Sequence, residues 1–192
     1  MYSNIISIGD HCVVPILLNE LMLRKKSYPF DWTTHEEQLH NTNILYNIEL
    51  IHRLDDIDQI LKEYISPTIT KNDRHICFPH EHGTQEEIVA KYKRRFERLK
   101  EDLTQKNIYI MLTRHYYIDS CTFETIRNTF HHDSLIVFIS GTNHPYFETM
   151  PYKNVIFQHI PYDISKFYDY DYTTFRPMVK TYLADLLNQL LH

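Results

Sequence analysis

The chain has 192 residues, of which 43% are hydrophobic and 23% are charged, and its formal net charge is -5 at pH 7. This length fits one α/β domain over residues 1–192, and the acidic balance excludes a surface dominated by basic residues, so we expect no nucleic-acid partner. No apolar run approaches the ~20 residues that cross a bilayer, so we expect no membrane association. The three cysteines include no Cys-x-x-Cys pair, which argues against a disulfide scaffold and favours a reducing compartment such as the cytoplasm.

The first segment has the pattern of an α/β unit. Residues 4–8 are rich in β-branched side chains and end at Gly9, which predicts a short buried strand. Apolar residues then recur at helical spacing over residues 13–23. Pro15 fixes the start of this helix, because proline is tolerated only in a first turn.

The next elements are predicted from turn and cap signals. A threonine at 33 or 34 can cap a helix that runs through residues 36–46, and a second amphipathic helix is expected over 55–64. Residues 68–78 have the pattern of a β-hairpin, with Asn72-Asp73 as the turn.

Helices and strands alternate in the second half of the chain. A long helix is predicted over residues 84–103, with Thr84 as its N-cap. The other predicted elements are strands at 107–112, 135–139 and 154–157 and helices at 123–130 and 180–191. This alternation predicts a single α/β domain with a mostly parallel sheet and helices on both faces, a Rossmann-like three-layer arrangement.

Polar segments follow the predicted strands, and parallel sheets gather such groups at the carboxyl ends of their strands. The first three such segments are Gly9-Asp10-His11-Cys12, Thr113-Arg114-His115 and Ser140-Gly141-Thr142-Asn143-His144. We therefore expect one site that contains a thiol, a guanidinium, several imidazoles and an amide. Its candidate pocket residues are Asp10, His11, Trp32, His82, Arg114, His115, Asn143 and His144.

Cys12 is the best candidate for chemistry in this set. The positive end of the helix that follows it favours a thiolate, and a neighbouring imidazole would complete a nucleophile–base pair. Asn143 or the backbone N–H groups at the helix start are candidates for an oxyanion hole. The competing interpretation is that Cys12 is a small buried hydrophobe, which is the interpretation that we adopt for Cys77 and Cys121.

Three other features favour simpler interpretations. The histidines at 80, 82, 131 and 132 have no HExxH or Cys-x-x-Cys spacing, so no metal and no cofactor is predicted. The basic residues at 91–98 are expected to form a solvated helix face, with an anion site as the alternative. The tyrosine-rich residues 162–172 are expected to form a packed surface loop.

Two N-terminal motifs carry a family resemblance. Residues 6–12 read Ile-Ser-Ile-Gly-Asp-His-Cys, and residues 23–32 read Leu-Arg-Lys-Lys-Ser-Tyr-Pro-Phe-Asp-Trp. Together with Phe78-Pro79-His80, Arg94-Arg95-Phe96 and Leu112-Thr113-Arg114, they resemble an uncharacterised family labelled "putative papain-like cysteine peptidase", found in bacteria and large DNA viruses. The resemblance implies Cys12 as the nucleophile, His80 as the base and Asp31 as a residue that orients an imidazole. It also implies a papain-like α+β fold as the alternative architecture.

Three functions are consistent with these residues. The leading hypothesis is a thiol-dependent hydrolase of the cytoplasm (the host cytoplasm for a viral protein), acting on an amide or ester in a peptide, glycan or small molecule. The second is a sugar- or nucleotide-handling α/β transferase, in which Arg114 and His115 bind an anionic group and Cys12 lines the pocket. The third is a non-enzymatic module that binds a host protein through its tyrosine-rich surface.

Overall fold

The computed structural model describes residues 1–9, 12–32, 34–35, 43–65, 76–77, 81–114, 116–149, 152–163, 165 and 171–191. The strands are β1 (Ile5–Ser7), β2 (Thr34–His35), β3 (Ile76–Cys77), β4 (Ile108–Thr113), β5 (Leu135–Ser140) and β6 (Val155–His159). The helices are α1 (Val13–Glu20), α2 (Asn43–His52), α3 (Ile57–Tyr64), α4 (Gln85–Asp102), α5 (Ser120–Asn128), α6 (Tyr146–Thr149), the π-helix η3 (Asp171–Phe175) and α8 (Arg176–Leu191).

The main sheet has four strands in the order β1-β4-β5-β6, and every pair is parallel. The two central strands, β4 and β5, are buried along their whole length. Their uninterrupted apolar runs explain this position, because a central parallel strand is covered on both faces. The parallel sheet that the sequence predicts is confirmed, and the papain-like α+β alternative is wrong.

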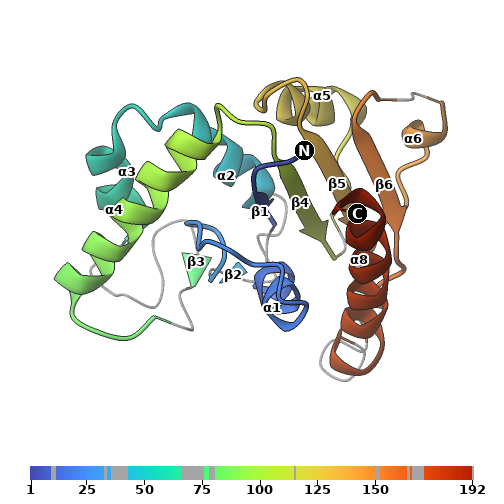
Figure 1. Ribbon diagram of the computed structural model, residues 1–192, viewed down its shortest axis with the longest axis horizontal. Helices are drawn as coiled ribbons and strands as arrows, with labels where there is room; N and C mark the ends of the chain where they lie inside the picture. Colours follow the sequence, from blue (N-terminus) through green and yellow to red (C-terminus); the bar gives the residue numbers. More distant parts are fainter. Residues whose placement is uncertain are drawn as a thin grey trace.

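Helices cover both faces of the sheet (Figure 1). On one face, Tyr109, Met111 and Phe138 pack in a cluster with apolar residues of α2, α3, α4 and α5. On the other face, Ile110 and Val137 pack with apolar residues of α1 and α8. Side chains alternate between these faces along each strand, so a single run of residues feeds both hydrophobic clusters.

Helix α8 runs back along the sheet, from the carboxyl ends of the strands to their amino ends (Figure 1). Its inward residues Val179, Leu183 and Leu187 are fully buried in the same cluster as Val13 and Val14 of α1. The first turn of α8 therefore lies at the edge where the polar segments after the strands gather. No helix in the described part of the chain is long and apolar enough to cross a membrane.

The long helix α4 forms where the sequence predicts it. Thr84 is its N-cap, and Thr84 and Glu87 make a reciprocal capping box, with the Thr84 Oγ1 accepting from the Glu87 N–H at 3.3 Å. The carboxylate of Glu87 accepts in turn from the Thr84 N–H at 2.8 Å. Such a box satisfies two N–H groups that the first helical turn leaves without intrahelical partners.

Several boundaries differ from the prediction. Residues 34–35 form β2, so Thr34 is in a strand rather than at a helix cap, and the described part of the next helix, α2, starts at Asn43. Residues 36–42 of the predicted helix lie outside the described residues. Strand β3 pairs antiparallel with β2, over 40 residues earlier in the chain. The rest of the predicted hairpin, residues 68–75 and 78, lies outside the described residues. Helix α5 begins at Ser120 rather than 123, because the carboxylate of Asp119 caps it by accepting from the Thr122 N–H at 2.9 Å. Helix α8 begins at Arg176 rather than 180, and α6 was not predicted.

Candidate functional site

Cys12 lies at the carboxyl edge of the sheet, where the chain passes from β1 into α1. It is the N-cap residue of α1, and its carbonyl accepts the first helical hydrogen bond, from the Ile16 N–H at 3.2 Å. Its side chain makes no capping hydrogen bond to the helix. Upstream, the side-chain amide of Asn47 in α2 donates to the carbonyl oxygen of Gly9 at 3.1 Å, which ties the end of β1 to the opposite helical layer.

The surroundings of the Cys12 thiol are charged. Cys12 is 5% exposed, yet it belongs to neither of the two hydrophobic clusters. Burial raises the pKa of the thiol, while the nearby guanidiniums of Arg176 and Arg114 act in the opposite direction and the carboxylate of Asp171 adds to the increase. Burial therefore opposes the effect that we expect from the helix start and the positive charges, and in the resting chain the loss of hydration is the largest influence on the thiol.

Arg114 follows β4 directly and is 3% exposed, so its guanidinium is held within the protein. The guanidinium carbon lies 5.8 Å from the centre of the Tyr162 ring. A Cβ placed on Gly141, at the end of β5, would lie 1.7 Å from the Arg114 carbonyl oxygen and 2.5 Å from the Cβ of Tyr162. Only glycine permits this close approach, which brings the ends of β4 and β5 and the segment after β6 together.

Arg176 and Asp171 complete the charged surroundings of the thiol. The Nε of Arg176 donates to the Oδ2 of Asp171 at 2.7 Å, and the guanidinium lies over the Tyr172 ring at 4.1 Å. Both side chains are largely buried, at 15% and 5% exposed. The sequence analysis missed both residues. The signal in the sequence is an aspartate at the end of the tyrosine-rich residues 162–172 with an arginine five positions after it.

His144 and Asn143 differ in what they can contribute. The ring of His144 is fully buried, its Nε2 accepts from the Ile118 N–H at 3.0 Å, and its Nδ1 lies 2.8 Å from the Thr142 carbonyl oxygen. An accepting Nε2 requires the proton to be on Nδ1, so both nitrogens are occupied in a neutral ring. Burial lowers the pKa of His144, in agreement with this state. His144 is a structural histidine in this arrangement, whereas Asn143 is exposed.

Asp31 is buried in a clamp that explains the second family motif. Its Oδ2 accepts from Arg24 at 2.9 Å and from the Tyr28 N–H at 2.8 Å. The Arg24 guanidinium also donates to Ser27 at 2.7 Å and lies over the ring of Trp32 at 4.6 Å. These contacts give Asp31 and Trp32 a structural role in the connector after α1. The role of Asp31 in orienting an imidazole stays a prediction.

Four predicted site residues, Asp10, His11, His80 and His115, lie outside the described residues. The prediction that a histidine acts as the base for Cys12 therefore rests on the sequence alone. The segment after His80 is anchored by Glu81, whose side chain is 2% exposed and accepts from Lys91 at 2.6 Å and from Arg95 at 2.7 Å. His82 next to it is exposed.

The basic face of α4 mainly binds its neighbours. Besides the two contacts with Glu81, Lys93 pairs with Asp58 of α3 at 2.7 Å, and Arg98 donates to the Ser27 carbonyl oxygen at 2.6 Å. The prediction of a solvated face holds only in part. Arg94 is exposed and the pair of Lys93 with Asp58 lies at the surface, whereas Arg95 is buried and Arg98 fastens α4 to the connector after α1. Over the described ranges, no group of three or more His, Cys, Asp or Glu side chains is placed to hold a metal ion.

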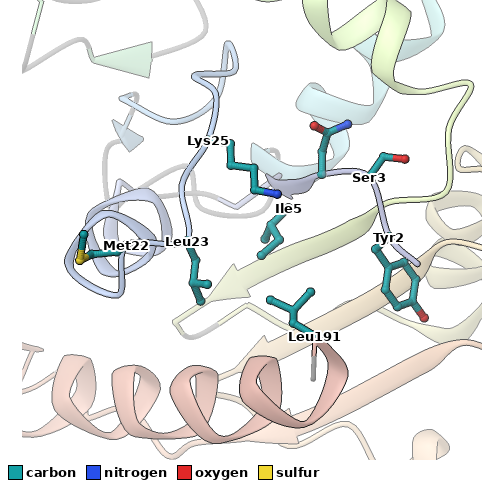
Figure 2. Close-up of a pocket in the computed structure, with 8 residues that line it drawn as sticks. Tyr2, Ser3, Ile5, Met22, Leu23, Lys25 and Leu191 are labelled. Atoms are coloured by element: carbon teal, nitrogen blue, oxygen red, sulfur yellow. The ribbon is translucent and has the colours of Figure 1, made fainter.

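A pocket with a volume of about 80 Å³ lies at the amino end of β1 (Figure 2), whereas Cys12 follows the carboxyl end of that strand. Ile5, Leu23 and Leu191 contribute apolar side chains to it, and Tyr2 and Lys25 lie at its sides. It is formed where the end of α8 meets the amino end of β1. None of the candidate chemical groups lines it, so it is not the functional site.

The comparison with protein families agrees with the two N-terminal motifs. The family described as "putative papain-like cysteine peptidase (DUF1796)" matches residues 3–137. The chain belongs to this family. No curated protein and no solved structure matches the chain. The family match includes Cys12 and Arg114, whereas Asp171 and Arg176 come from the part of the chain that follows it.

Proposed function

We propose that this family member is a thiol-dependent hydrolase, in which the sulfur of Cys12 attacks the carbonyl carbon of an amide or ester. The observation that supports this most strongly is the position of the thiol at the start of α1, outside both hydrophobic clusters and beside the guanidiniums of Arg114 and Arg176. A cysteine that only fills space lies among apolar groups. A thiol beside cations at a helix start is in the setting of a nucleophile.

The proposed reaction uses a base because the resting thiol is protonated. The Cys12 proton passes to an imidazole, assigned to His80 with His115 as the alternative, and the thiolate forms a bond to the carbonyl carbon. The tetrahedral intermediate then expels the amine or alcohol, which takes the proton back from the imidazolium. Water hydrolyses the resulting thioester and regenerates the thiol.

The start of α1 offers stabilisation for the oxyanion of this intermediate. The backbone N–H groups of Val13 and Val14 precede the first helical hydrogen bond, which is made by Ile16, and Pro15 has no N–H. These two donors and the positive end of the helix lie next to the sulfur that forms the new bond. They are our candidates for the oxyanion hole, together with the Asn143 side chain.

Alkylation with iodoacetamide at neutral pH tests the nucleophile, with peptide mapping to separate the cysteines. Cys121 is exposed and serves as the internal reference for an ordinary thiol. We expect Cys12 to react faster than Cys121 despite its burial, because the proposed imidazole takes its proton. We also expect p-nitrophenyl acetate to acylate the wild-type and Cys121→Ser proteins much faster than Cys12→Ser, which keeps only ordinary nucleophiles such as the exposed Cys121. Alkylation of Cys12 at or below the rate of Cys121 would contradict the proposal.

The buried guanidinium of Arg114 favours a second candidate, an α/β transferase that acts on a sugar phosphate or a nucleotide. Arg114 follows the second strand of a parallel sheet, at the edge where such enzymes bind phosphate groups. In this case Cys12 would line the pocket without reacting. A Cys12→Ala protein that still transfers or hydrolyses its substrate at the wild-type rate would favour this candidate.

A further inference from the structure

Arg176 has the geometry of a preorganised anion-binding group. Its Nε is held by Asp171 at 2.7 Å and its plane is supported by the ring of Tyr172 at 4.1 Å. Within the described part of the chain, its two terminal nitrogens, Nη1 and Nη2, donate no hydrogen bond. A guanidinium fixed through Nε and through its face presents these nitrogens as a fork that matches two oxygens of a carboxylate or phosphate.

Asp171 supplies an independent indication of a ligand. Asp171 is 3% exposed, and its Oδ2 accepts a hydrogen bond from Arg176. Its other carboxylate oxygen, Oδ1, is buried without a hydrogen-bond partner among the described residues. A buried carboxylate oxygen without a donor is unfavourable, and such atoms are rare in folded proteins. A ligand that brings an N–H or O–H group to this oxygen would remove the cost.

Packing places this pair beside the thiol. Phe175, between Asp171 and Arg176 in sequence, lies in the same hydrophobic cluster as Val13 and Val14, the residues that follow Cys12. The ring of Tyr162 packs edge-on against Phe175 at 4.9 Å and also contacts the Arg114 guanidinium. Together with the influence of the Arg176, Arg114 and Asp171 charges on the Cys12 thiol, this packing places the start of α8 near the start of α1 and the end of β4.

We infer that Arg176 and Asp171 select the substrate of Cys12: Arg176 binds an anionic group of the substrate, and the Oδ1 of Asp171 accepts a hydrogen bond from a donor close to that group. This inference rests on the proposed hydrolase function and specifies its substrate class. Among amides, an anionic group and a nearby hydrogen-bond donor occur together where the amine side is an amino acid with a free carboxylate. N-acylated amino acids and the last residue of a peptide have this arrangement.

Alkylation with two reagents that differ mainly in charge tests the inference. Iodoacetate carries a carboxylate and iodoacetamide does not, so the ratio of their rates at one cysteine reports attraction of an anion to that site. We expect this ratio to be about tenfold higher at Cys12 than at Cys121 in the same sample, as one charge-assisted hydrogen-bonded pair implies. Arg176→Gln should bring the two ratios together, and Arg176→Lys should restore only part of the difference.

Lys180→Gln is the matched control, since Lys180 is a cation one helical turn further along α8 that pairs with Glu20 on the surface. It should leave the ratio at Cys12 unchanged. A second readout uses the melting temperature of the wild-type and Arg176→Gln proteins. N-acetylglycine should raise the wild-type melting temperature and N-acetylglycine amide should not, whereas a rise with inorganic phosphate alone would assign the site to phosphate esters and overturn the amino-acid assignment.

The outcomes separate this inference from the proposed function. If Cys12 reacts rapidly with iodoacetamide but shows no preference for iodoacetate, the inference is refuted and the hydrolase proposal stands. If Cys12 reacts with neither reagent, the hydrolase proposal fails and the melting temperatures decide the anion site. Stabilisation by N-acetylglycine that Arg176→Gln abolishes would support the site, and no stabilisation would refute it.

Discussion

The Gly141→Ala substitution is the sharpest test of how the site is built. Gly141 donates its N–H to the Thr113 carbonyl oxygen at 2.9 Å, so the backbones at the ends of β4 and β5 are already in contact. An added Cβ would lie 1.7 Å from the Arg114 carbonyl oxygen and 2.7 Å from its carbonyl carbon. Backbone atoms cannot turn away as the end of a side chain can. The two strand ends must therefore separate by about 1.7 Å to reach the ordinary contact distance of 3.4 Å.

The expected cost is at or above the upper end of the range for an overpacked site, about 3 kcal/mol or more. For a domain of this size, each kcal/mol lowers the melting temperature by roughly 2–4 °C, so a decrease of about 6–12 °C is expected. The displacement moves Arg114, so the alkylation rate of Cys12 should change as well. Differential scanning calorimetry and the alkylation assay measure the two effects in one preparation.

Gly9→Ala is the matched control because Gly9 ends β1 at the same edge of the sheet. Its added Cβ would lie 3.2 Å from the Leu112 carbonyl oxygen and 3.3 Å from the Leu112 nitrogen, so a shift of a few tenths of an ångström is enough. We expect this change to cost less than about 1 kcal/mol. The reasoning is refuted if Gly141→Ala melts within about 2 °C of the wild-type protein, or if Gly9→Ala is destabilised as much as Gly141→Ala.

Three further predictions concern buried charges and rings. Arg24→Met leaves the Asp31 carboxylate buried without its cation and should lower the free energy of unfolding by about 3–5 kcal/mol in urea titrations. Arg53→Met, which breaks an exposed ion pair with Glu63, should lower it by less than about 1 kcal/mol. Equal losses from the two substitutions would contradict this prediction. The pKa of His144 is lowered by burial, so the stability that its neutral ring contributes is present above the pKa of an unfolded histidine and is lost as the pH falls through the lower folded value. His144→Phe should lower the free energy of unfolding by about 2 kcal/mol or more at pH 7.5. Between pH 7.5 and pH 5, this variant should lose less stability than the wild-type protein loses. An equal loss in the two proteins would exclude His144 as the source of the acid dependence. Burial raises the pKa of Tyr109 to about 12. As the pH is raised, tyrosinate absorbance should therefore increase in two phases, and the second phase should coincide with unfolding. One reversible phase near pH 10 would refute this prediction.

The parts of the fold that the sequence predicts are those encoded locally. Strands β4 and β5 are continuous apolar runs that end in polar residues, and α4 has both its capping box and its apolar stripe within 20 residues of sequence. The parallel topology then brings Cys12 and Arg114 to one edge. This placement needs only the order of the strands and the fact that their carboxyl ends face the same way.

The parts that sequence reasoning missed depend on contacts between distant segments. Strand β2 pairs with β3 across more than 40 residues, and neither strand is long enough to produce a recognisable alternation. The charge of Arg176 acts on the Cys12 thiol only because α8 folds back along the sheet and packs in the same cluster as α1. The clamp between Arg24 and Asp31 is local, by contrast. Its arginine and aspartate are seven residues apart in a predicted connector, a spacing that a charge-pairing search would have found.

The family name and the architecture of this chain agree if the proposed nucleophile is considered separately from its scaffold. Cys12 precedes a helix, a position that suits a thiol nucleophile, but that helix follows the first strand of a parallel sheet. The charges around the thiol come from residues 114, 171 and 176, so they are assembled only when α8 docks on the sheet. The thiol and Arg114 lie within the segment that matches the family, and the proposed anion-binding pair lies after it. Because separate segments supply the proposed nucleophile and the proposed selecting charges, we expect substitutions near the start of α8 to change the substrate without altering the position of the sulfur.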